Sequence, residues 1–210
     1  MLSLNWADLH DQKKIVMLLK NNDLLVGTSD TVWGLYAQTT EQAFLKLNAI
    51  KKRENNKPYL ILVADTAHLA LFVSHDDIDR VSSLMRSCWP GPLTLIMRAK
   101  QNLPSYMMGP RNSIAVRVPA HPFLRAVLMQ VPGLFSTSAN LAGDPVPAQT
   151  QDINPLILDQ VAALVSDSPQ SPSLSEPSTI LDCTYDPIRV VRRGAFSVEK
   201  LEKICGVSFD

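Results

Sequence analysis

Short apolar runs bounded by turn-forming residues alternate with amphipathic segments along the first half of this 210-residue chain. An apolar run of roughly four to eight residues is typical of a buried strand, and an apolar stripe at every third or fourth residue is typical of a helix. Strand-like runs predominate in the second half. This order predicts an α/β fold, with one domain over residues 1–210, a mixed parallel and antiparallel sheet, and flanking helices.

Individual segments can be assigned from their apolar spacing and their end signals. Strands are expected at residues 24–28, 59–64, 93–99, 113–119, 134–140, 179–184 and 188–194. Helices are expected at residues 8–22, 39–53, 66–72, 76–85, 121–130 and 197–205. Thr39 and Gln42 have the spacing of a capping box, and Ser197 is the expected N-cap of the last helix. The Ser/Pro-rich residues 166–178 predict a mobile loop.

The composition favours a folded cytoplasmic protein. Apolar residues make up 46% of the chain, which is enough to fill a core. Charged residues make up 19%, which is too few for long disordered tracts. The three cysteines lie far apart in the sequence and leave an odd thiol, which fits a reducing cytosol better than secretion. The sequence contains neither a signal peptide nor a run of roughly 18 apolar residues, so no membrane association is expected.

Charge is distributed unevenly although the net charge is zero. Residues 80–143 contain Arg and Lys but no Asp or Glu, whereas residues 144–188 contain Asp and Glu but no Lys or Arg. The positive segment indicates an anionic ligand or an anionic surface. Alternatively, the two segments pack together and neutralise each other, and the sequence leaves both explanations open.

The stretch KKRENNK at residues 51–57 concentrates four cations after the second expected helix. If the chain is extended there, Lys51 and Arg53 could reach the same polyphosphate, because an Arg offers a planar fork of donors and a Lys a compact charge. The alternative is a solvated basic face at a helix C-terminus, where positive charge is favourable in itself.

Hydroxyl groups and buried arginines offer further candidate ligand contacts. The stretch STSAN at residues 136–140 follows an apolar strand, where ligands of open α/β sheets bind, but it could equally be a turn. Arg117 lies among apolar residues of an expected strand, with no acidic residue nearby in the sequence. A buried guanidinium is costly without an anion, which could be a structural carboxylate from elsewhere in the chain, but a ligand carboxylate or phosphate is the sharper hypothesis. Arg192 and Arg193 pose the same question.

The stretch GTSDT at residues 27–31 places two hydroxyls and an acid at the end of a buried strand. Either an ordinary turn or a ligand at the strand's carboxyl end would explain it. The sequence contains no P-loop, no glycine-rich dinucleotide turn and no nucleophile elbow, and the histidines have no metal-binding spacing. Residue patterns alone therefore indicate an α/β protein that holds an anionic ligand through side chains.

Seven stretches occur along the chain in the order TSDTVWGL, KKRENNKPYLILV, WPGPLTLIM, SIAVRVPAHP, STSANLAG, PSTILD and VVRRG. In this order they resemble the YrdC/TsaC family of L-threonylcarbamoyladenylate synthases, and the resemblance extends from about Asp23 to about Gly194. The resemblance implies a twisted α/β sheet with a positively charged concavity. It also implies that L-threonine, bicarbonate and ATP, with Mg²⁺, give threonylcarbamoyl-AMP and pyrophosphate for the modification of adenosine 37 in tRNA. The chain resembles the short bacterial form, which hands its product to separate tRNA-threonylcarbamoyl transfer proteins.

The resemblance also implies two sets of site residues. Those expected on the ATP side are Lys51, Arg53, Ser113, Ser138, Asn140 and Arg192. Those expected around the threonine are Ser29, Thr31, Arg117, Thr137 and Ser178, with Asp30 either a ligand or a turn former. No protein nucleophile is needed, because phosphoryl transfer depends mainly on positioning and on neutralising charge. The metal ligands are not identified.

The sequence departs from the family pattern at several of these positions. Thr28 stands where the family has Pro, Ser29 replaces a Thr, and Glu54 places a negative charge beside the expected phosphates. Three alternative functions remain beside this one. They are those of a YciO-like paralogue, of a carbamoyl-phosphate-dependent domain as in hydrogenase-maturation carbamoyltransferases, and of an RNA-binding module that uses the basic segment 80–143.

Overall fold

The computed structural model describes residues 1–52, 58–167, 176–206 and 208–210. Arg53, Glu54 and most of the Ser/Pro-rich stretch 166–178 lie outside these ranges. The described strands are β1 (Leu2–Asn5), β2 (Leu25–Gly27), β3 (Gly34–Gln38), β4 (Leu60–Leu62), β5 (Leu93–Arg98), β6 (Ser113–Arg117), β7 (Leu134–Ser138), β8 (Ala163–Ser166), β9 (Thr179–Asp182) and β10 (Arg189–Arg192). The described α-helices are α1 (Leu9–Lys20), α2 (Glu41–Lys51), α3 (His75–Arg80), α4 (Ser82–Cys88), α5 (Pro122–Leu128), α6 (Pro155–Leu158) and α7 (Val198–Cys205). Short 3₁₀ turns lie at Thr66–Leu71, Ser105–Met107, Pro110–Asn112 and Thr150–Asp152.

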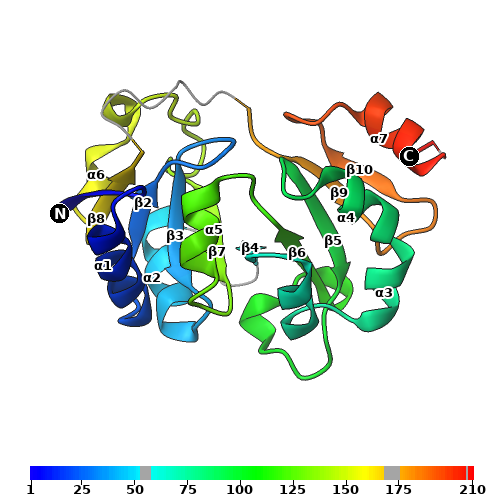
Figure 1. Ribbon diagram of the computed structural model, residues 1–210, viewed down its shortest axis with the longest axis horizontal. Coiled ribbons are helices and arrows are strands. Elements are labelled where there is room, and N and C mark those ends of the chain that lie inside the picture. Colours follow the sequence, from blue (N-terminus) through cyan, green and yellow to red (C-terminus); the bar gives the residue numbers. More distant parts are fainter. Residues whose placement is uncertain (53–57, 168–175, 207) are drawn as a thin grey trace.

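These strands form one mixed sheet in the order β1-β8-β2-β3-β7-β4-β6-β5-β9-β10, so β1 and β10 lie at opposite ends of the molecule (Figure 1). The pairs β1–β8, β2–β8, β4–β6 and β5–β9 are parallel. The pairs β2–β3, β3–β7, β4–β7, β5–β6 and β9–β10 are antiparallel. The predicted fold class, a mixed sheet with flanking helices, is confirmed. The order is far from sequential, so segments distant in the chain become neighbours at the centre of the sheet.

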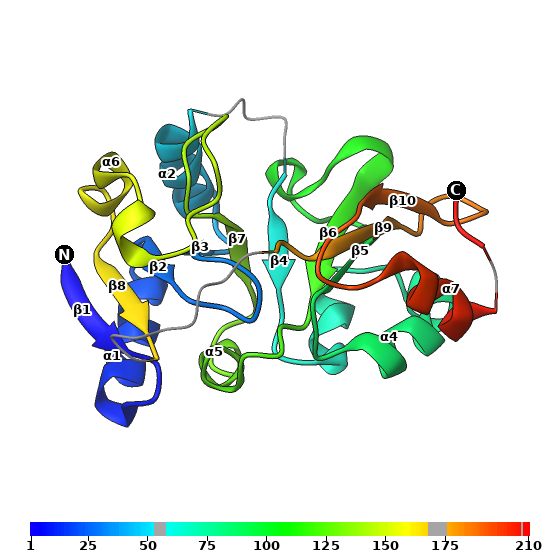
Figure 2. The same ribbon diagram turned by 90° about the horizontal axis from the view of Figure 1, so that it is seen from above.

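Two apolar clusters form the core, and strand β3 separates them. Tyr36 packs into the cluster that includes α1, whereas Leu35 and Ala37 pack into the cluster that includes α2. Successive side chains of a strand point to opposite faces, so the two helices cover opposite faces of β3 (Figure 2). No helix among the described residues is both long enough and apolar enough to cross a bilayer.

Most expected elements are present, but some were missed. Strands β1, β3 and β8 were not predicted. Strand β3 is buried on both faces and therefore lacks the polar–apolar alternation that reveals a half-exposed strand. The N-cap of α2 is Thr40 rather than Thr39, because the Oγ1 atom of Thr40 accepts the N–H of Ala43. Ser197 caps α7 as predicted, by accepting the N–H of Lys200.

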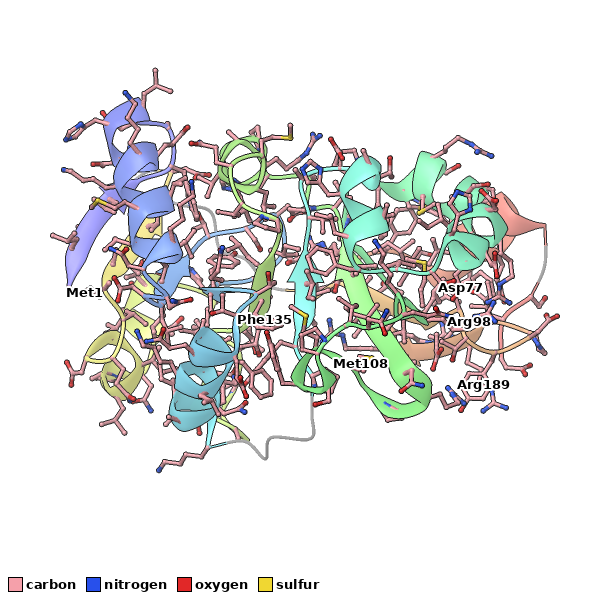
Figure 3. All side chains as sticks on the ribbon, turned by 90° about the horizontal axis from the view of Figure 1, so that it is seen from below. Met1, Asp77, Arg98, Met108, Phe135 and Arg189 are labelled. Carbon is pink, nitrogen blue, oxygen red and sulfur yellow. The ribbon has the colours of Figure 1, made fainter. Side chains whose placement is uncertain are left out.

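Two arginines of the basic segment pair with acidic residues that lie outside it, one before and one after it in the sequence. Arg98 pairs with the fully buried Asp77 at 2.7 Å, and Figure 3 shows this pair near the end of the molecule opposite Met1. Arg111 pairs with Asp182 at 3.1 Å, which links the basic segment to the acidic one. The proposed mutual neutralisation of residues 80–143 and 144–188 thus accounts for Arg111 but not for Arg98, whose partner precedes both segments.

Candidate functional site

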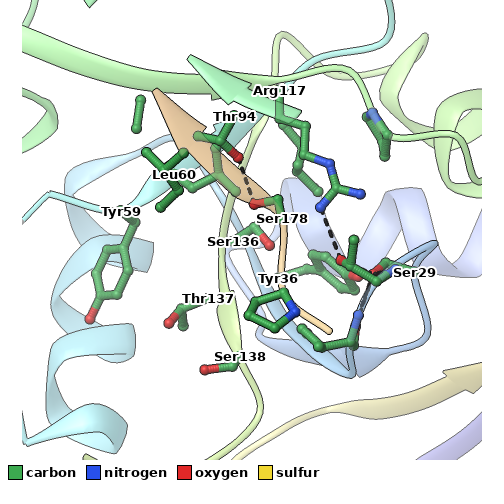
Figure 4. Close-up of a pocket in the computed structure, with 18 of the residues that line it drawn as sticks. Ser29, Tyr36, Tyr59, Leu60, Thr94, Arg117, Ser136, Thr137, Ser138 and Ser178 are labelled. Carbon is green, nitrogen blue, oxygen red and sulfur yellow. Dashed lines mark hydrogen bonds between the residues drawn. The ribbon is translucent and has the colours of Figure 1, made fainter. Parts of the chain in front are cut away.

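A cavity of about 300 Å³ lies over the centre of the sheet, where β3, β7, β4, β6, β5 and β9 are consecutive neighbours. Its walls come from distant parts of the chain, because these strands are not in sequence order (Figure 4). Seven of the residues predicted to bind ligand line it, namely Ser29, Thr31, Arg117, Thr137, Ser138, Ser178 and Arg192. The structure therefore gathers most of the residues predicted for the two substrates around one cavity.

Arg117, the last residue of β6, is buried beside this cavity with 4% of its surface exposed. Its Nε atom donates to the carbonyl of Gly91 at 2.9 Å, and its Nη1 atom donates to the Oγ1 atom of Thr31 at 3.0 Å. Its Nη2 atom lies 2.5 Å from the Oδ1 atom of Asp30, in a charge contact that is not aligned as a hydrogen bond. The sequence left open whether a structural carboxylate or a ligand meets Arg117, and Asp30 is such a structural partner, because the loop after β2 folds back onto β6.

The loop between β2 and β3 is shaped by its own hydroxyl groups. The hydroxyl of Ser29 donates to the carbonyl of Val32 at 2.8 Å and lies 3.1 Å from the Oγ1 atom of Thr31. The other oxygen of Asp30, Oδ2, accepts the N–H of Ala120 at 2.9 Å. The stretch GTSDT is therefore a hydrogen-bonded turn that also presents Ser29 and Thr31 to the cavity, and Asp30 is the ion-pair partner of Arg117.

Arg192 and Ser178 form a second polar group on the same cavity. The Nε and Nη2 atoms of Arg192 donate to the carbonyl of Ser178 at 3.0 and 2.8 Å, and Nη2 also donates to its hydroxyl at 3.1 Å. Burial lowers the pKa of Arg192 below its usual range, and the positive charge of Arg117 lowers it further. All these acceptors are neutral, so this guanidinium gives the cavity a positive charge suited to an anionic ligand.

Thr94 extends this group, although its role was not anticipated from the sequence. Its hydroxyl is buried and lies 2.8 Å from the hydroxyl of Ser178, which already accepts from Arg192. Two hydroxyl protons are available, and only one lies between the two oxygens. The second proton can be donated to a ligand in the cavity. Thr94 and Ser178 together therefore offer one hydroxyl donor to such a ligand.

Lys51, Ser138 and Asn140 meet at the carboxyl end of β7. The Nζ atom of Lys51 donates to the carbonyls of Ser138 at 3.0 Å and of Asn140 at 2.5 Å, and to the Oδ1 atom of Asn140 at 3.1 Å. Lys51 is the last residue of α2, so the chain at Lys51 is helical, within the helix predicted for residues 39–53, and not extended. Lys51 and Asn140 do not line the cavity themselves and reach it through Ser138, which does.

Ser113 lies farther from the cavity than the other predicted residues. It begins β6 and shares one face of that strand with Ala115 and Arg117, both of which line the cavity. Ser113 itself is buried and is not part of the lining. In the described part of the chain, no group of three or more His, Cys, Asp or Glu residues could hold a metal ion.

The sequence of this chain is similar to those of one protein family and its named members. The Sua5–YciO–YrdC family model, described as "Telomere recombination", matches residues 17–194. A protein of Xylella fastidiosa (strain M23) named threonylcarbamoyl-AMP synthase is 32% identical over 171 residues, which are 80% of this chain and 90% of that protein.

Two solved structures have a similar fold. Sua5 of P. abyssi, crystallised with L-threonine, has a TM-score of 0.88 at 22% identity. It matches all of this chain, which spans 62% of the length of that protein. YciO of E. coli has a TM-score of 0.78 at 20% identity, with 94% of this chain and 97% of that chain covered. At these identities the two structures support the fold alone.

Proposed function

The chain belongs to the Sua5–YciO–YrdC family, and from this premise we propose that it synthesises threonylcarbamoyl-AMP from L-threonine, bicarbonate and ATP. The observation that carries the proposal is the single cavity that gathers Arg117, Thr31 and Ser29 with Arg192, Ser178 and Ser138. A relative named for this activity at 32% identity and the L-threonine complex of P. abyssi Sua5 support it. The product would pass to tRNA-threonylcarbamoyl transfer proteins.

In the proposed reaction, the amine of threonine and bicarbonate give a carbamate and water. A carbamate oxygen then attacks the α-phosphorus of ATP, the bond to the bridging oxygen breaks, and pyrophosphate leaves. The chain needs to align the two substrates and offset negative charge, since no covalent intermediate with the protein is required. We assign Ser29, Thr31, Arg117, Thr137 and Ser178 to the amino acid. We assign Lys51, Arg53, Ser113, Ser138, Asn140 and Arg192 to the nucleotide.

Mg²⁺ is proposed as the companion of ATP, where it would neutralise phosphate charge. The triphosphate would supply ligand oxygens, because Mg²⁺ is usually bound through substrate phosphates together with few protein carboxylates. The chain's own contribution is a set of fixed donors. The acceptors of Arg192 in the contacts given above are neutral oxygens, so these contacts do not cancel its positive charge.

The proposed function is tested by measuring pyrophosphate release with ATP and bicarbonate and with threonine, serine or no amino acid. Release that depends on threonine is expected. Release that ignores threonine, or none at all, would contradict the proposal and favour the YciO-like alternative, which the likeness to E. coli YciO keeps open. A gel shift with structured RNA, with and without ATP and threonine, tests the RNA-binding alternative, whose affinity should fall steeply with salt.

Thr94→Val is expected to raise the KM for threonine by about two- to tenfold, the effect of losing one hydrogen bond. Valine has nearly the same shape as threonine but lacks the hydroxyl that adjoins Ser178. The KM is measured from pyrophosphate release as the threonine concentration is varied. Thr94→Ser keeps the hydroxyl and should restore the wild-type KM. Equal KM values in wild type and Thr94→Val would exclude the proposed role.

A further inference from the structure

Tyr36 contributes an aromatic wall to the cavity. It lies on β3, lines the cavity and is only 1% exposed (Figure 4). Its hydroxyl donates to the carbonyl of Thr28 at 3.3 Å, and its ring packs edge-on against Trp6 with 6.2 Å between the ring centroids. The hydrogen bond and the contact with Trp6 together fix the position of the Tyr36 ring, and therefore of the cavity wall that it forms.

Gly27 and Gly34 have no side chain, and the ring of Tyr36 packs closely over their backbone. A Cβ atom at Gly34 would lie 2.8 Å from both the Cζ and the Oη atoms of Tyr36. A Cβ atom at Gly27, on the neighbouring strand, would lie 3.3 Å from the Cε2 atom of the ring and 2.8 Å from Trp6. The ring therefore covers the backbone of β2 and β3 closely, and it cannot move toward the sheet to make the cavity larger.

The ring also lies beside the residues assigned to the amino acid. Ser29 and the charged pair of Asp30 and Arg117 are near enough to influence the hydroxyl of Tyr36. Burial, the main effect, raises the pKa of Tyr36 far above its usual range, so the hydroxyl stays neutral. The side chain is thus unsuited to transfer a proton at neutral pH, and its contribution is its shape.

We propose that Tyr36 determines the amino-acid specificity of the site by limiting the size of the side chain that fits beside Ser29 and Arg117. The inference rests on the proposed function, because it assumes that an amino acid binds there. A fixed aromatic wall excludes substrates with longer side chains by steric overlap, whereas it leaves the carboxylate and amine contacts unchanged. Replacing the ring with a smaller side chain should therefore change the choice of amino acid more than the affinity for ATP.

The test compares Tyr36→Leu with wild type in pyrophosphate release with serine, threonine, valine, isoleucine and leucine. The ratio of kcat/KM for isoleucine to that for threonine should rise by at least about tenfold, the discrimination that an apolar pocket achieves per methylene. Tyr36→Phe keeps the ring and should leave this ratio within about twofold of wild type. Tyr106→Leu is the matched control, because Tyr106 packs against Phe44 and Phe135 and does not line the cavity.

Circular dichroism verifies that the variants fold, because Tyr36 is part of the core. If Tyr36→Leu does not fold, Tyr36→Met fills more of the space and carries the same expectation. A folded variant whose ratio stays at the wild-type value would overturn the inference while leaving the proposed function intact. Wild-type protein that releases pyrophosphate without regard to the amino acid would overturn the proposed function, and this inference with it.

Discussion

Arg117→Ala is expected to lower the free energy of unfolding by about 3 kcal/mol, at the lower end of the range for breaking a buried ion pair. The substitution leaves Asp30, whose side chain is 14% exposed, without its cation. Asp30 keeps the hydrogen bond from Ala120, which is why the lower end of the range applies. For a chain of this length, the loss corresponds to a fall in Tm of about 6–12 °C. Threonine-dependent pyrophosphate release should also be lost, because the assigned carboxylate contact disappears.

A double-mutant cycle separates the ion pair from other effects of Arg117→Ala. Asp30→Asn removes the negative charge and keeps the shape, so Arg117→Ala should cost less in the Asp30→Asn background than in wild type. The free energy of unfolding is measured by urea denaturation for the four proteins. A cost that is the same in both backgrounds, or a single-variant cost below about 1 kcal/mol, would show that the pair does not stabilise the fold.

Lys51→Ala is expected to slow pyrophosphate release by about tenfold to a hundredfold or more, the effect of losing a charge-assisted hydrogen bond of roughly 1.5–3 kcal/mol. Lys51 is buried at the end of α2, and its ammonium lies against Ser138, which lines the cavity. The proposed role is to offset charge on the phosphates as pyrophosphate leaves. The rate is measured with saturating threonine and bicarbonate, so that a loss of affinity for those substrates does not contribute.

Lys46→Ala provides the matched control for this prediction. Lys46 lies on the same helix and also donates to a backbone carbonyl, that of Asn22 at 2.7 Å, but Asn22, unlike Ser138, does not line the cavity. Its removal should leave the rate within about twofold of wild type, since it contributes only a partly exposed ion pair. Equal rates for Lys51→Ala and Lys46→Ala would remove Lys51 from the proposed site.

Much of the fold could be predicted from the sequence, because local patterns decide where helices and strands form. The amphipathic stripe of α1, Pro122 in the first turn of α5 and the cap at Ser197 each depend on residues close together in the chain. Strand β3 could not be recognised, because its two faces are buried by α1 and α2, which pack against it only in the folded chain. The order of the strands likewise depends on pairing between distant segments.

Site residues could be predicted where a hydroxyl or a cation directly follows a strand or helix in the sequence. They could not be predicted where two side chains that interact are far apart in the sequence. Ser29, Thr31 and Ser138 were identified from such positions and line the cavity. The pairing of Arg117 with Asp30 was missed, because it requires the loop after β2 to reach β6. Thr94 and Tyr36 lie inside strands, where nothing in the local sequence separates a residue that faces a cavity from one that faces the core.

If one cavity joins an amino acid, bicarbonate and ATP, the reaction product must carry atoms of all three. Mass spectrometry of the product formed from ¹³C-labelled bicarbonate measures this. We expect one molecule that contains AMP, threonine and the labelled carbonyl carbon, formed in step with pyrophosphate. AMP that appears without the labelled carbon, or a labelled product that forms equally well in the absence of threonine, would contradict it.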